Sequence, residues 1–600
     1  MSTMQELKYP YDPDYILRKK KAIKRQLLER EGVNYITKKI AILGGSTTND
    51  IKLILELFLL DYGIKPEFFE SEYNKYYEDA LFGNEELDEF KPDICFIHTT
   101  SRNILTYPDV NMSKAQVDAL ARDTYQRFEG CWTALFKRYS CTIIQNNFEM
   151  PYFRLLGNSD CSDIHGRLNF INRLNGMFAS FAESNESFFI NDINYISAEY
   201  GIKKWADPSD WYRYKYALSV SAIPDLAFNL ARIIKAIYGR NKKAFALDMD
   251  NTLWGGIVGD DGPENIKIGH EDAESELYTE FQQYIKAHKD LGILLTVASK
   301  NDEENALAGL ARPDSTLTKE DFLVIKANWD NKDRNIMQTA KELNIGADSF
   351  VFVDDNPAER ALVLNQIPGI SVPEVGEPES YIGILDRSGF FEVTNLSGDD
   401  LKRGEMYKAN IERAKSSMSF DNYDDYLRSL EMHAEIKPFS PMYMSRIAEL
   451  TNKSNQFNLT TRRCSQAEIE SIAEDPKFIT RYGKLEDKFG DNGVVAVTFG
   501  HEEDSPEGRI FHIDLWLMSC RVLKRGMECA MMDEIIAECK KRGISKIKGY
   551  YYPTAKNKMV KDFYKQQGFE LLREDGRENT EWGLDLEKPY KSGNIAITVN

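Results

Sequence analysis

Cysteine is scarce in this chain and is not arranged in pairs. Only 8 of the 600 residues are cysteine, and they are scattered without CxxC pairs or regular spacing. Disulfide-rich secreted folds and structural zinc sites both need cysteines at repeated short spacings. The distribution therefore argues against both and indicates reduced thiols, as in a cytosolic protein.

Long apolar runs and an excess of basic charge are also missing. The best apolar run, from Ile51 to Leu60, is interrupted by charged residues and falls short of the roughly 20 residues of a membrane span. Pro10 and Asp12 stand where a secretory signal would be apolar. The formal net charge of -19 argues against non-specific binding to nucleic acid or to an acidic membrane. We therefore expect a cytoplasmic protein with neither of these partners.

One short apolar stretch ends in a pair of acids. Residues 244–247 run directly into Asp248 and Asp250, which are separated by one residue. The apolar run predicts a buried strand of a parallel sheet, where functional residues lie at the carboxyl end. In extended chain, residues two apart point to the same side. One carboxylate can then attack an electrophile while the other exchanges a proton. A plain strand ending in an Asp-Asn turn remains the alternative for this pair alone.

Three later features follow this acid pair in a fixed order. A second predicted strand, 294–299, ends in Ser299, and Lys332 stands in a turn before a predicted helix. A third predicted strand, 350–353, is followed by Asp354 and Asp355. Taken alone, Lys332 would be interpreted as a surface lysine. Together with the acid pair, the ordered set resembles the four motifs of the haloacid dehalogenase (HAD) superfamily of phosphotransferases.

The HAD resemblance implies a capless Rossmann-like domain that uses Mg²⁺. It implies that Asp248 is the phosphoryl nucleophile and that Asp250 is the general acid and base. It implies that Ser299 and Lys332 hold and neutralise the phosphoryl oxygens. The implied metal ligands are Asp248, the backbone carbonyl of Asp250, and Asp354 or Asp355.

Several stretches narrow the resemblance to one branch of that superfamily. The stretches 250–262, 328–329 and 353–360 are similar to FkbH-like proteins, and the similarity continues through 449–463 and 516–523. FkbH-like proteins are linked to moving a three-carbon unit from 1,3-bisphosphoglycerate to the phosphopantetheine thiol of an acyl carrier protein, with loss of the other phosphate. The resemblance thus implies two partners, an acyl carrier protein and a small phosphorylated substrate.

The region before this domain alternates between apolar strands and helical stretches from Lys39 onward. This alternation predicts a parallel sheet with helices on both faces. It resembles a divergent SGNH hydrolase, with Ser46 at the nucleophile position and Asn103 as a candidate oxyanion donor. A serine nucleophile needs a base, but no histidine lies between His165 and His270. A binding or docking module is therefore favoured, and an esterase remains the alternative.

The C-terminal region resembles the GNAT acyltransferase fold. Residues 493–499 and 511–517 alternate like half-buried strands. In the following loop Arg521 and Gly526 match the pyrophosphate-binding pattern of that fold, whereas Lys524 replaces its middle glycine. This departure favours the phosphopantetheine arm of a carrier protein over CoA itself. Cys520, among basic residues before a predicted helix, is a candidate thiolate that carries the acyl group. A buried core cysteine is the alternative.

The predicted fold class is therefore α/β multidomain, with an SGNH- or flavodoxin-like sheet, a HAD domain and a GNAT-like α+β domain. The predicted boundaries are a basic helical lead-in (1–38), an SGNH-like domain (39–240), a HAD-like domain (241–390), a helical connector (391–432) and a GNAT-like domain (433–600). The leading function is Mg²⁺-dependent phosphoryl and acyl transfer to a carrier-protein thiol. The alternatives are a simple phosphomonoesterase with binding-only flanking domains, a scaffold in glycan or natural-product assembly, and an acetyl-CoA-dependent N-acetyltransferase.

Overall fold

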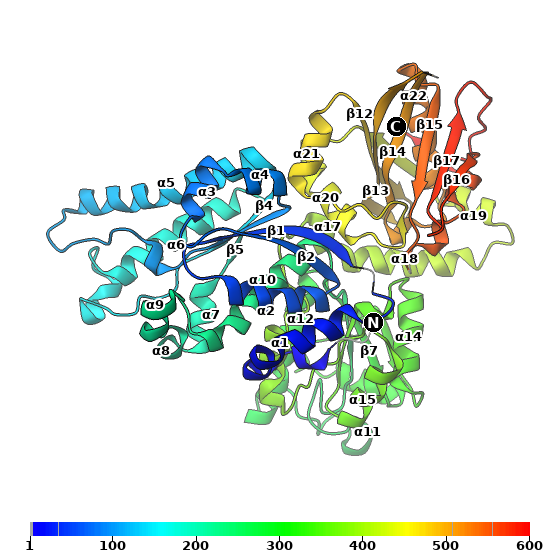
Figure 1. Ribbon diagram of the computed structural model, residues 1–600. Helices are drawn as coiled ribbons and strands as arrows, with labels where there is room; N and C mark the ends of the chain where they lie inside the picture. The colour runs from blue at the N-terminus through cyan, green and yellow to red at the C-terminus, as the bar shows by residue number, and fades with distance from the viewer. Residues whose placement is uncertain (1–3, 34, 507, 555) are drawn as a thin grey trace. The chain divides into compact units, whose positions relative to one another are not determined.

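The protein contains three β-sheets that are distributed over two compact units. The computed structural model describes residues 4–33, 35–506, 508–554 and 556–600. The first unit comprises Met4–Tyr238 and Ser465–Glu470, and the second comprises Gly239–Cys464 and Ser471–Asn600. Figure 1 shows the elements of each unit along the chain. Among the described residues, every helix is too short or too polar to cross a membrane.

The first unit is built on a five-stranded parallel sheet with the order β2-β1-β3-β4-β5. Its strands are β1 (Ile36–Gly44), β2 (Ile64–Glu70), β3 (Ile94–His98), β4 (Thr142–Asn146) and β5 (Phe188–Asn191). Because successive residues of a strand point to opposite faces, Ile40 and Ile42 pack against one layer of helices while Ala41 and Leu43 pack against another. This confirms the predicted parallel sheet with helices on both faces (Figure 1).

The helices of the first unit divide between these two layers. One layer holds α1 (Pro13–Leu28), α2 (Asn49–Asp61), α7 (Ile193–Tyr200) and α10 (Ile223–Ile237). The other holds α3 (Tyr76–Phe82), α4 (Glu85–Phe90), α5 (Lys114–Tyr139) and α6 (Arg167–Glu183). Two short helices, α8 (Ile202–Trp205) and α9 (Pro208–Tyr214), follow α7.

The structure corrects the predicted lead-in at residues 1–38. Helix α1 buries Ile16, Ile23 and Leu27 in the core of the first unit, and β1 begins at Ile36 rather than at residue 39. The polar strand start is stable because Lys38 buries its aliphatic stem and places Nζ 3.4 Å from the Asp93 carboxylate. The lead-in is therefore part of the fold that follows it.

The second unit contains a four-stranded parallel sheet with the order β8-β7-β6-β9. The strands are β6 (Ala244–Leu247), β7 (Leu294–Ser299), β8 (Val324–Ala327) and β9 (Phe350–Val353). One face is covered by α12 (Ala273–Asp290), α13 (Glu303–Leu310) and α16 (Tyr381–Arg387), and the other by α14 (Lys332–Glu342) and α15 (Pro357–Gln366). Between β6 and β7 the chain forms only a loop, α11 (Val258–Asp261) and α12, as expected for a capless domain.

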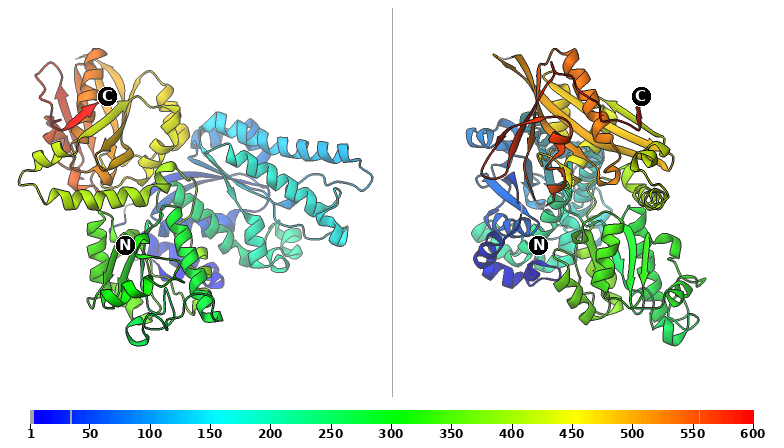
Figure 2. Two further views of the ribbon diagram at one scale, coloured as in Figure 1. Left: turned by 180° about the vertical axis from the view of Figure 1, so that it is seen from behind. Right: turned by 90° about the vertical axis from the view of Figure 1, so that its right-hand side faces the viewer.

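The second sheet of this unit has nine strands and is mostly antiparallel. Its strands are β10 (Met432–Lys437), β11 (Phe457–Asn458), β12 (Phe478–Asp487), β13 (Gly490–Ser505), β14 (Gly508–Met518), β15 (Lys546–Tyr551), β16 (Glu570–Glu574), β17 (Thr580–Asp585) and β18 (Ile597–Val599). Helix α22 (Met527–Lys541) connects the parallel neighbours β14 and β15 and lies against one face of the sheet (Figure 2). The remaining helices here are α20 (Met444–Lys453) and α23 (Phe563–Gln566), and α21 (Gln466–Glu474) crosses the boundary between the residues assigned to the two units.

The connector between the two sheets of the second unit is helical, as predicted, and is tied to the nine-stranded sheet. It consists of α17 (Gly398–Leu401), α18 (Arg403–Ser417) and α19 (Tyr423–Ser429). The buried Asp487 carboxylate accepts a hydrogen bond from Arg413 of α18 at 2.7 Å and another from Arg525 at 3.0 Å. One acid thus holds two buried guanidinium groups, which joins the connector to the loop before α22.

Replacing this shared acid is expected to destabilise the protein. In Asp487→Asn the two guanidinium groups stay buried but lose their counter-charge, so the free energy of unfolding should fall by about 3–5 kcal/mol. Asp425→Asn is the matched control, because Asp425 pairs with Arg428 at an exposed position and should contribute at most about 1 kcal/mol. Urea denaturation of both variants measures the difference, and equal effects would contradict this account.

Candidate active site

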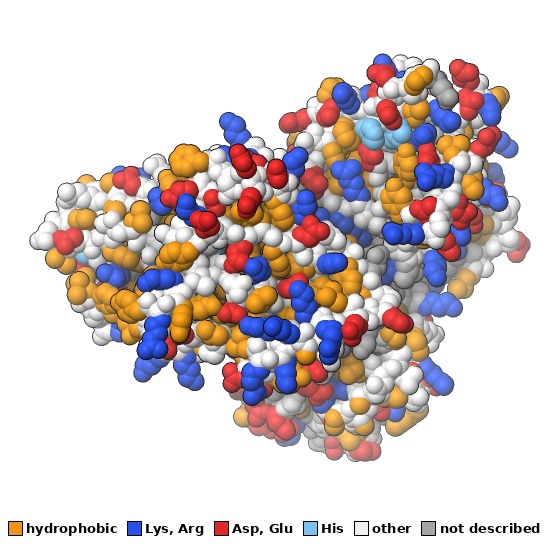
Figure 3. Space-filling view, viewed as in Figure 1, with side chains coloured by type: hydrophobic (Ala, Val, Ile, Leu, Met, Phe, Trp, Pro, Cys, Tyr) orange, Lys and Arg blue, Asp and Glu red, His pale blue; other side chains and the backbone are white. Residues whose placement is uncertain are grey.

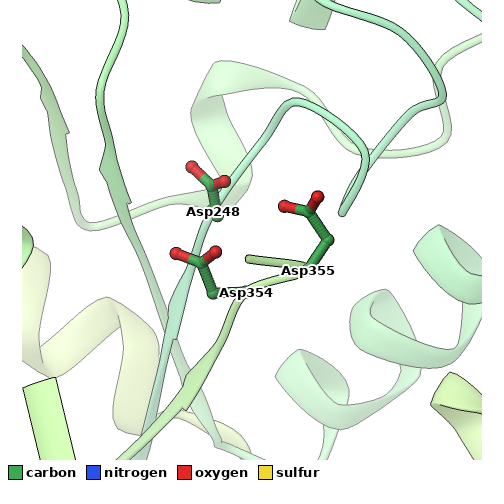
Figure 4. Close-up of side chains that lie close together, drawn as sticks. All are labelled: Asp248, Asp354 and Asp355. Carbon is green, nitrogen blue, oxygen red and sulfur yellow. The ribbon is translucent and has the colours of Figure 1, made fainter. Parts of the chain in front are cut away.

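Three carboxylates meet at the carboxyl end of two neighbouring strands. Asp248 follows β6, while Asp354 and Asp355 follow β9, and one oxygen of each lies within 4.8 Å of one oxygen of the others. Figure 4 shows the three side chains around a common space. Asp354 is completely buried and Asp248 nearly so. The sequence predicted all three as metal ligands, and the parallel sheet brings them together because its strand ends share one edge.

The backbone around these acids is held by hydrogen bonds between the two strand ends. The amide of Asp248 donates to the carbonyl of Val353 at 3.0 Å, which continues the ladder between β6 and β9. The amide of Asp355 donates to Thr252 Oγ1 at 3.2 Å. Arg360 donates to the carbonyls of Asp354 and Asp355 at 2.8 and 2.7 Å. These hydrogen bonds hold the backbone from which each carboxylate side chain extends.

Lys332 is the cation of the site, rather than a surface lysine. It stands in the first turn of α14 and is 3% exposed. Its Nζ lies 3.0 Å from Asp248 and 2.5 Å from Asp354. Burial alone lowers the pKa of this lysine, but the two carboxylates outweigh burial and raise the pKa. Lys332 therefore stays charged and offsets part of the repulsion between the acids.

The carboxylates of β9 resist ionisation. Burial raises the pKa of Asp354 to about 7, the negative charge of Asp248 adds to the effect, and Lys332 opposes it. Burial and Asp248 likewise raise the pKa of Asp355. One nearby lysine is thus too little positive charge for three acids, and a further cation would relieve the remaining repulsion.

The donor set fits a hard divalent cation. All three candidate ligands are carboxylate oxygens, and they stand close enough to share one ion. Hard cations such as Mg²⁺ prefer oxygen ligands and commonly bind through a few carboxylates, with the remaining positions left for water and phosphate oxygens. The predicted fourth ligand, the backbone carbonyl of Asp250, lies in the same loop that begins at Asp248. The site residues therefore suit the cation that the sequence predicts.

The Asp250 carboxylate is held by its own set of hydrogen-bond donors, which do not contact the carboxylates of the three metal-ligand candidates. Its Oδ1 accepts hydrogen bonds from Trp254 Nε1 at 2.9 Å and from the Val258 amide at 3.1 Å. Its Oδ2 accepts one from Asn301 at 3.0 Å. Burial raises the pKa of Asp250, the donors at Val258 and Trp254 lower it, and the charge of Asp248 raises it, with a net rise. A carboxyl with a raised pKa suits a group that gives and takes a proton.

The structure adds residues that sequence reasoning missed. Asn301 contacts Asp250, Thr252 holds the backbone of Asp355, and Arg360 holds the carbonyls of the β9 acids. Each stands two to six residues from a recognised motif residue, which was the only signal in the sequence. Ser299, which the sequence predicted, is buried at the end of β7 and accepts a backbone hydrogen bond from the amide of Asn328.

The other predicted catalytic residue, Cys520, lies in a separate cavity of the second unit. The cavity measures about 240 Å³ and is lined by residues at the end of α14, by α18 and α19, and by the loop before α22. Cys520 lies within hydrogen-bonding reach of Tyr407, and burial together with the Cys520 thiol raises the pKa of that tyrosine. Asn344 donates to the Cys520 carbonyl at 3.1 Å. The thiol therefore belongs to this cavity rather than to the carboxylate site.

The three residues predicted to hold a phosphopantetheine or CoA group are distributed around the same loop. Arg521 lines the cavity beside Cys520, whereas Lys524 and Gly526 do not. Lys524 adopts a left-handed backbone conformation (φ 64°), and its carbonyl accepts a hydrogen bond from Tyr423 at 2.8 Å. Gly526, at φ 83°, caps the N-terminus of α22. The cavity also contains Arg413 and Arg525, which the sequence did not single out as ligands.

In the possible esterase site of the first unit, the candidate nucleophile has no base hydrogen-bonded to it among the described residues. Ser46 follows β1 and is buried, and among the described residues its Oγ has no hydrogen-bond partner. Asn103 donates to the carbonyl of Gly45 at 3.0 Å, so its amide is engaged by backbone. A serine nucleophile is activated by a hydrogen-bonded base. This geometry agrees with the preference for a binding module over an esterase.

Comparison with known proteins identifies the family. Residues 39–235 match the FkbH N-terminal domain. The chain is also similar to the crystal structure of the N-terminal part of the protein BF1531 from Bacteroides fragilis, which contains a phosphatase domain complexed with Mg. The identity is 31%, the TM-score is 0.58, and the match covers 63% of this chain and 99% of that chain. The chain belongs to the FkbH-like phosphatase family.

Other matches to this FkbH-like protein are weaker. The ribosomal-protein-S18-alanine N-acetyltransferase from Escherichia coli is 15% identical, with a TM-score of 0.20, and the match covers 26% of this chain and 94% of that chain. An N-acetyltransferase from Staphylococcus aureus Mu50 is 14% identical, with a TM-score of 0.19, and the match covers 26% and 99%. At these TM-scores neither likeness carries a functional argument. No curated protein matches the chain.

Cation binding to the FkbH-like protein should depend on pH. Because the pKa of Asp354 is raised to about 7, the proton competes with Mg²⁺ below that pH. The apparent Kd for Mg²⁺ should weaken by about tenfold for each pH unit below 7 and level off above it. Isothermal titration with Mg²⁺ between pH 5.5 and 8.5 measures this, and a Kd independent of pH would contradict it.

The raised pKa of Asp354 also determines how the stability of the metal-free protein changes with pH. Asp354 keeps its proton in the native state up to about pH 7, whereas an unfolded aspartate loses it near pH 4. The contribution of Asp354 to the free energy of unfolding is therefore fully present at low pH and is lost as the pH rises from about 4 to 7. Asp354→Asn should remove this component, which thermal unfolding in EDTA at several pH values measures.

Proposed function

We propose that the protein is a Mg²⁺-dependent phosphohydrolase that acts on a small phosphorylated compound. The observation that carries the proposal is the cluster of Asp248, Asp354 and Asp355 with Lys332 buried between two of them. Bound Mg²⁺ would be held by these three carboxylates and supplies the positive charge that lets an anionic nucleophile approach a phosphoryl group. The Mg-bound phosphatase-domain relative from Bacteroides fragilis supports the choice of ion.

In the proposed first step, Asp248 is the nucleophile. One oxygen of its carboxylate attacks phosphorus, the bond from phosphorus to the leaving oxygen breaks, and an aspartyl phosphate forms. Asp250 donates its proton to the leaving oxygen, which departs as an alcohol. Its raised pKa favours the protonated form that this step needs, while Asn301 and Trp254 keep the carboxyl oriented.

In the second step, water attacks the phosphorus of the aspartyl phosphate. Asp250, now ionised, takes a proton from that water as its oxygen bonds to phosphorus. The bond from phosphorus to the Asp248 oxygen breaks, which releases phosphate and restores the carboxylate. Lys332 holds its positive charge beside Asp248 in both steps and stabilises the negative charge that develops on the phosphoryl oxygens.

Kinetic measurements should distinguish the roles of Asp248 and Asp250. Asp250→Asn removes the proton donor and acceptor, so kcat for phosphate release should fall by about 10²–10⁴-fold. Asp248→Asn removes the nucleophile and should prevent formation of the hydroxylamine-labile phosphoenzyme. The control is Asp260→Asn, an exposed acid in α11, which should retain normal turnover. Phosphate release in Asp248→Asn at the wild-type rate would refute the mechanism.

We further propose that Cys520 carries out an acyl transfer. We also propose that the protein acts in the cytoplasm. With 1,3-bisphosphoglycerate as substrate, the Cys520 thiolate attacks the acyl carbon, the carbon–oxygen bond to phosphate breaks, and a thioester forms. The thiol of an acyl carrier protein then attacks the thioester and frees Cys520. The remaining phosphate monoester is hydrolysed at Asp248. The FkbH-like family membership supports this sequence of reactions.

The cavity around Cys520 supports the acyl-transfer proposal physically. Its lining includes Arg413, Arg521 and Arg525, and two of these guanidinium groups share the single carboxylate of Asp487. Such a positive surface suits the phosphate of a phosphopantetheine arm or of CoA.

Intact-protein mass spectrometry tests the acyl transfer. The protein is mixed with Mg²⁺ and freshly generated 1,3-bisphosphoglycerate, and we expect an adduct with the mass of a glyceryl or phosphoglyceryl group. The adduct should be absent in Cys520→Ser and present in Cys529→Ser, the control at another partly exposed cysteine of the same region. Phosphate release without any adduct would reject the acyl transfer and leave a simple phosphomonoesterase.

A further inference from the structure

The first unit contains a larger cavity that the proposed reaction does not use. It measures about 460 Å³, within the size range of small-molecule sites. It is lined by the loops that follow β3 and β4, the start of α6, and the short helices α8 and α9. The cavity therefore lies where parallel α/β sheets bind ligands, beyond the carboxyl ends of their strands.

Two arginines of this cavity are held by aromatic rings rather than by acids. The guanidinium carbon of Arg102 lies 4.3 Å from the centre of the Trp211 ring. That of Arg167 lies 4.6 Å from the centre of Tyr107 and 4.3 Å from that of Phe153. Among the described residues, neither guanidinium group has a carboxylate oxygen within 4.0 Å. A guanidinium stacked on a ring keeps its in-plane N–H groups available to an anion.

The acid in the cavity does not cancel the two positive charges. Glu149 is buried, and its two carboxylate oxygens accept hydrogen bonds from the amide and the hydroxyl of Ser101 at 3.0 and 2.7 Å. Burial raises the pKa of Glu149 despite these hydrogen bonds and the charge of Arg102. Its oxygens are thus already engaged within the protein, which leaves both arginines to meet a negative group from outside.

We propose that this cavity binds the phosphate group of a small organic phosphate with an apolar body. A phosphate monoester carries a charge of about -1.5 to -2 at pH 7 and three acceptor oxygens. It therefore matches two guanidinium groups better than a carboxylate does. The cavity also exceeds the size of phosphate alone, so a ligand that fills it has an organic part.

The surroundings of the cavity indicate that this organic part is apolar. Four large hydrophobic side chains of the lining are exposed: Tyr152, Phe153, Ile202 and Tyr212. Figure 3 shows hydrophobic side chains gathered over the part of the first unit that holds α8 and α9. Apolar walls with a few well-placed polar groups are the usual composition of small-molecule sites.

Binding of phenylphosphonate to the full-length protein in EDTA tests the proposal. This probe has a phosphonate dianion on an apolar ring, and its carbon–phosphorus bond resists hydrolysis at the carboxylate site. We expect isothermal titration to show binding to the wild-type protein, with inorganic phosphate and phenol each binding at least tenfold more weakly. The proposal is independent of the phosphohydrolase function, because none of its residues belongs to the carboxylate site.

Matched variants assign the binding to the cavity. Arg102→Gln and Arg167→Gln should each weaken phenylphosphonate binding at least tenfold, and Arg102→Lys should restore only part of the affinity because lysine lacks the planar fork. Arg154→Gln is the control, an exposed arginine outside the lining, and should bind normally. Lys332→Met, in the carboxylate site, should also retain binding. Circular dichroism confirms that each variant is folded.

Three outcomes would overturn the proposal. The first is a wild-type protein that does not bind phenylphosphonate. The second is unchanged affinity in Arg102→Gln and Arg167→Gln, and the third is loss of binding in Lys332→Met, which would place the probe at the carboxylate site. Equal affinity for inorganic phosphate and phenylphosphonate would show that the apolar part of the ligand does not contribute to binding. The cavity would then be a simple phosphate site.

Discussion

Repulsion among Asp248, Asp354 and Asp355 is the constraint on which the catalytic centre depends. The sheet register places these carboxylates within 4.8 Å of one another, and burial denies them the screening of water. Lys332 offsets part of the repulsion, and a divalent cation has the charge that balances the rest. The same repulsion that costs stability in the metal-free protein therefore creates affinity for the ion that the reaction needs.

The two parallel sheets use the same principle in different ways. Both present polar residues beyond the carboxyl ends of their strands, where loops can carry functional groups without disturbing the core. In the second unit these groups are acids around one lysine. In the first unit they are arginines stacked on aromatic rings, with Ser46 buried and unpaired. Arginines placed to meet an anion, together with a serine that has no hydrogen-bonded base among the described residues, suit binding rather than hydrolysis.

Much of the carboxylate site was predictable because each motif residue stands directly after an apolar strand. Asp248, Asp354 and Asp355 were recognised in this way, and Lys332 was recognised from its order in the chain. Several strands were missed, namely β2, β5 and β8. Strand β2 contains polar residues and a proline, and β8 is only half-buried, so neither has a continuous apolar run. The start of β1 was missed because Lys38 and Lys39 resemble a helix end.

The amino-acid sequence by itself determined which residues are candidates for phosphoryl chemistry, because strand ends and their acids are local features of the chain. Only the tertiary structure decided which distant groups complete each site. Asn301 orients Asp250 from the end of another strand, 51 residues along the chain. Arg413 joins Arg525 on Asp487 beside the Cys520 cavity. Arg102 and Trp205 meet around one cavity from separate elements. Such contacts form only when distant elements pack together, so the local pattern of residues does not predict them.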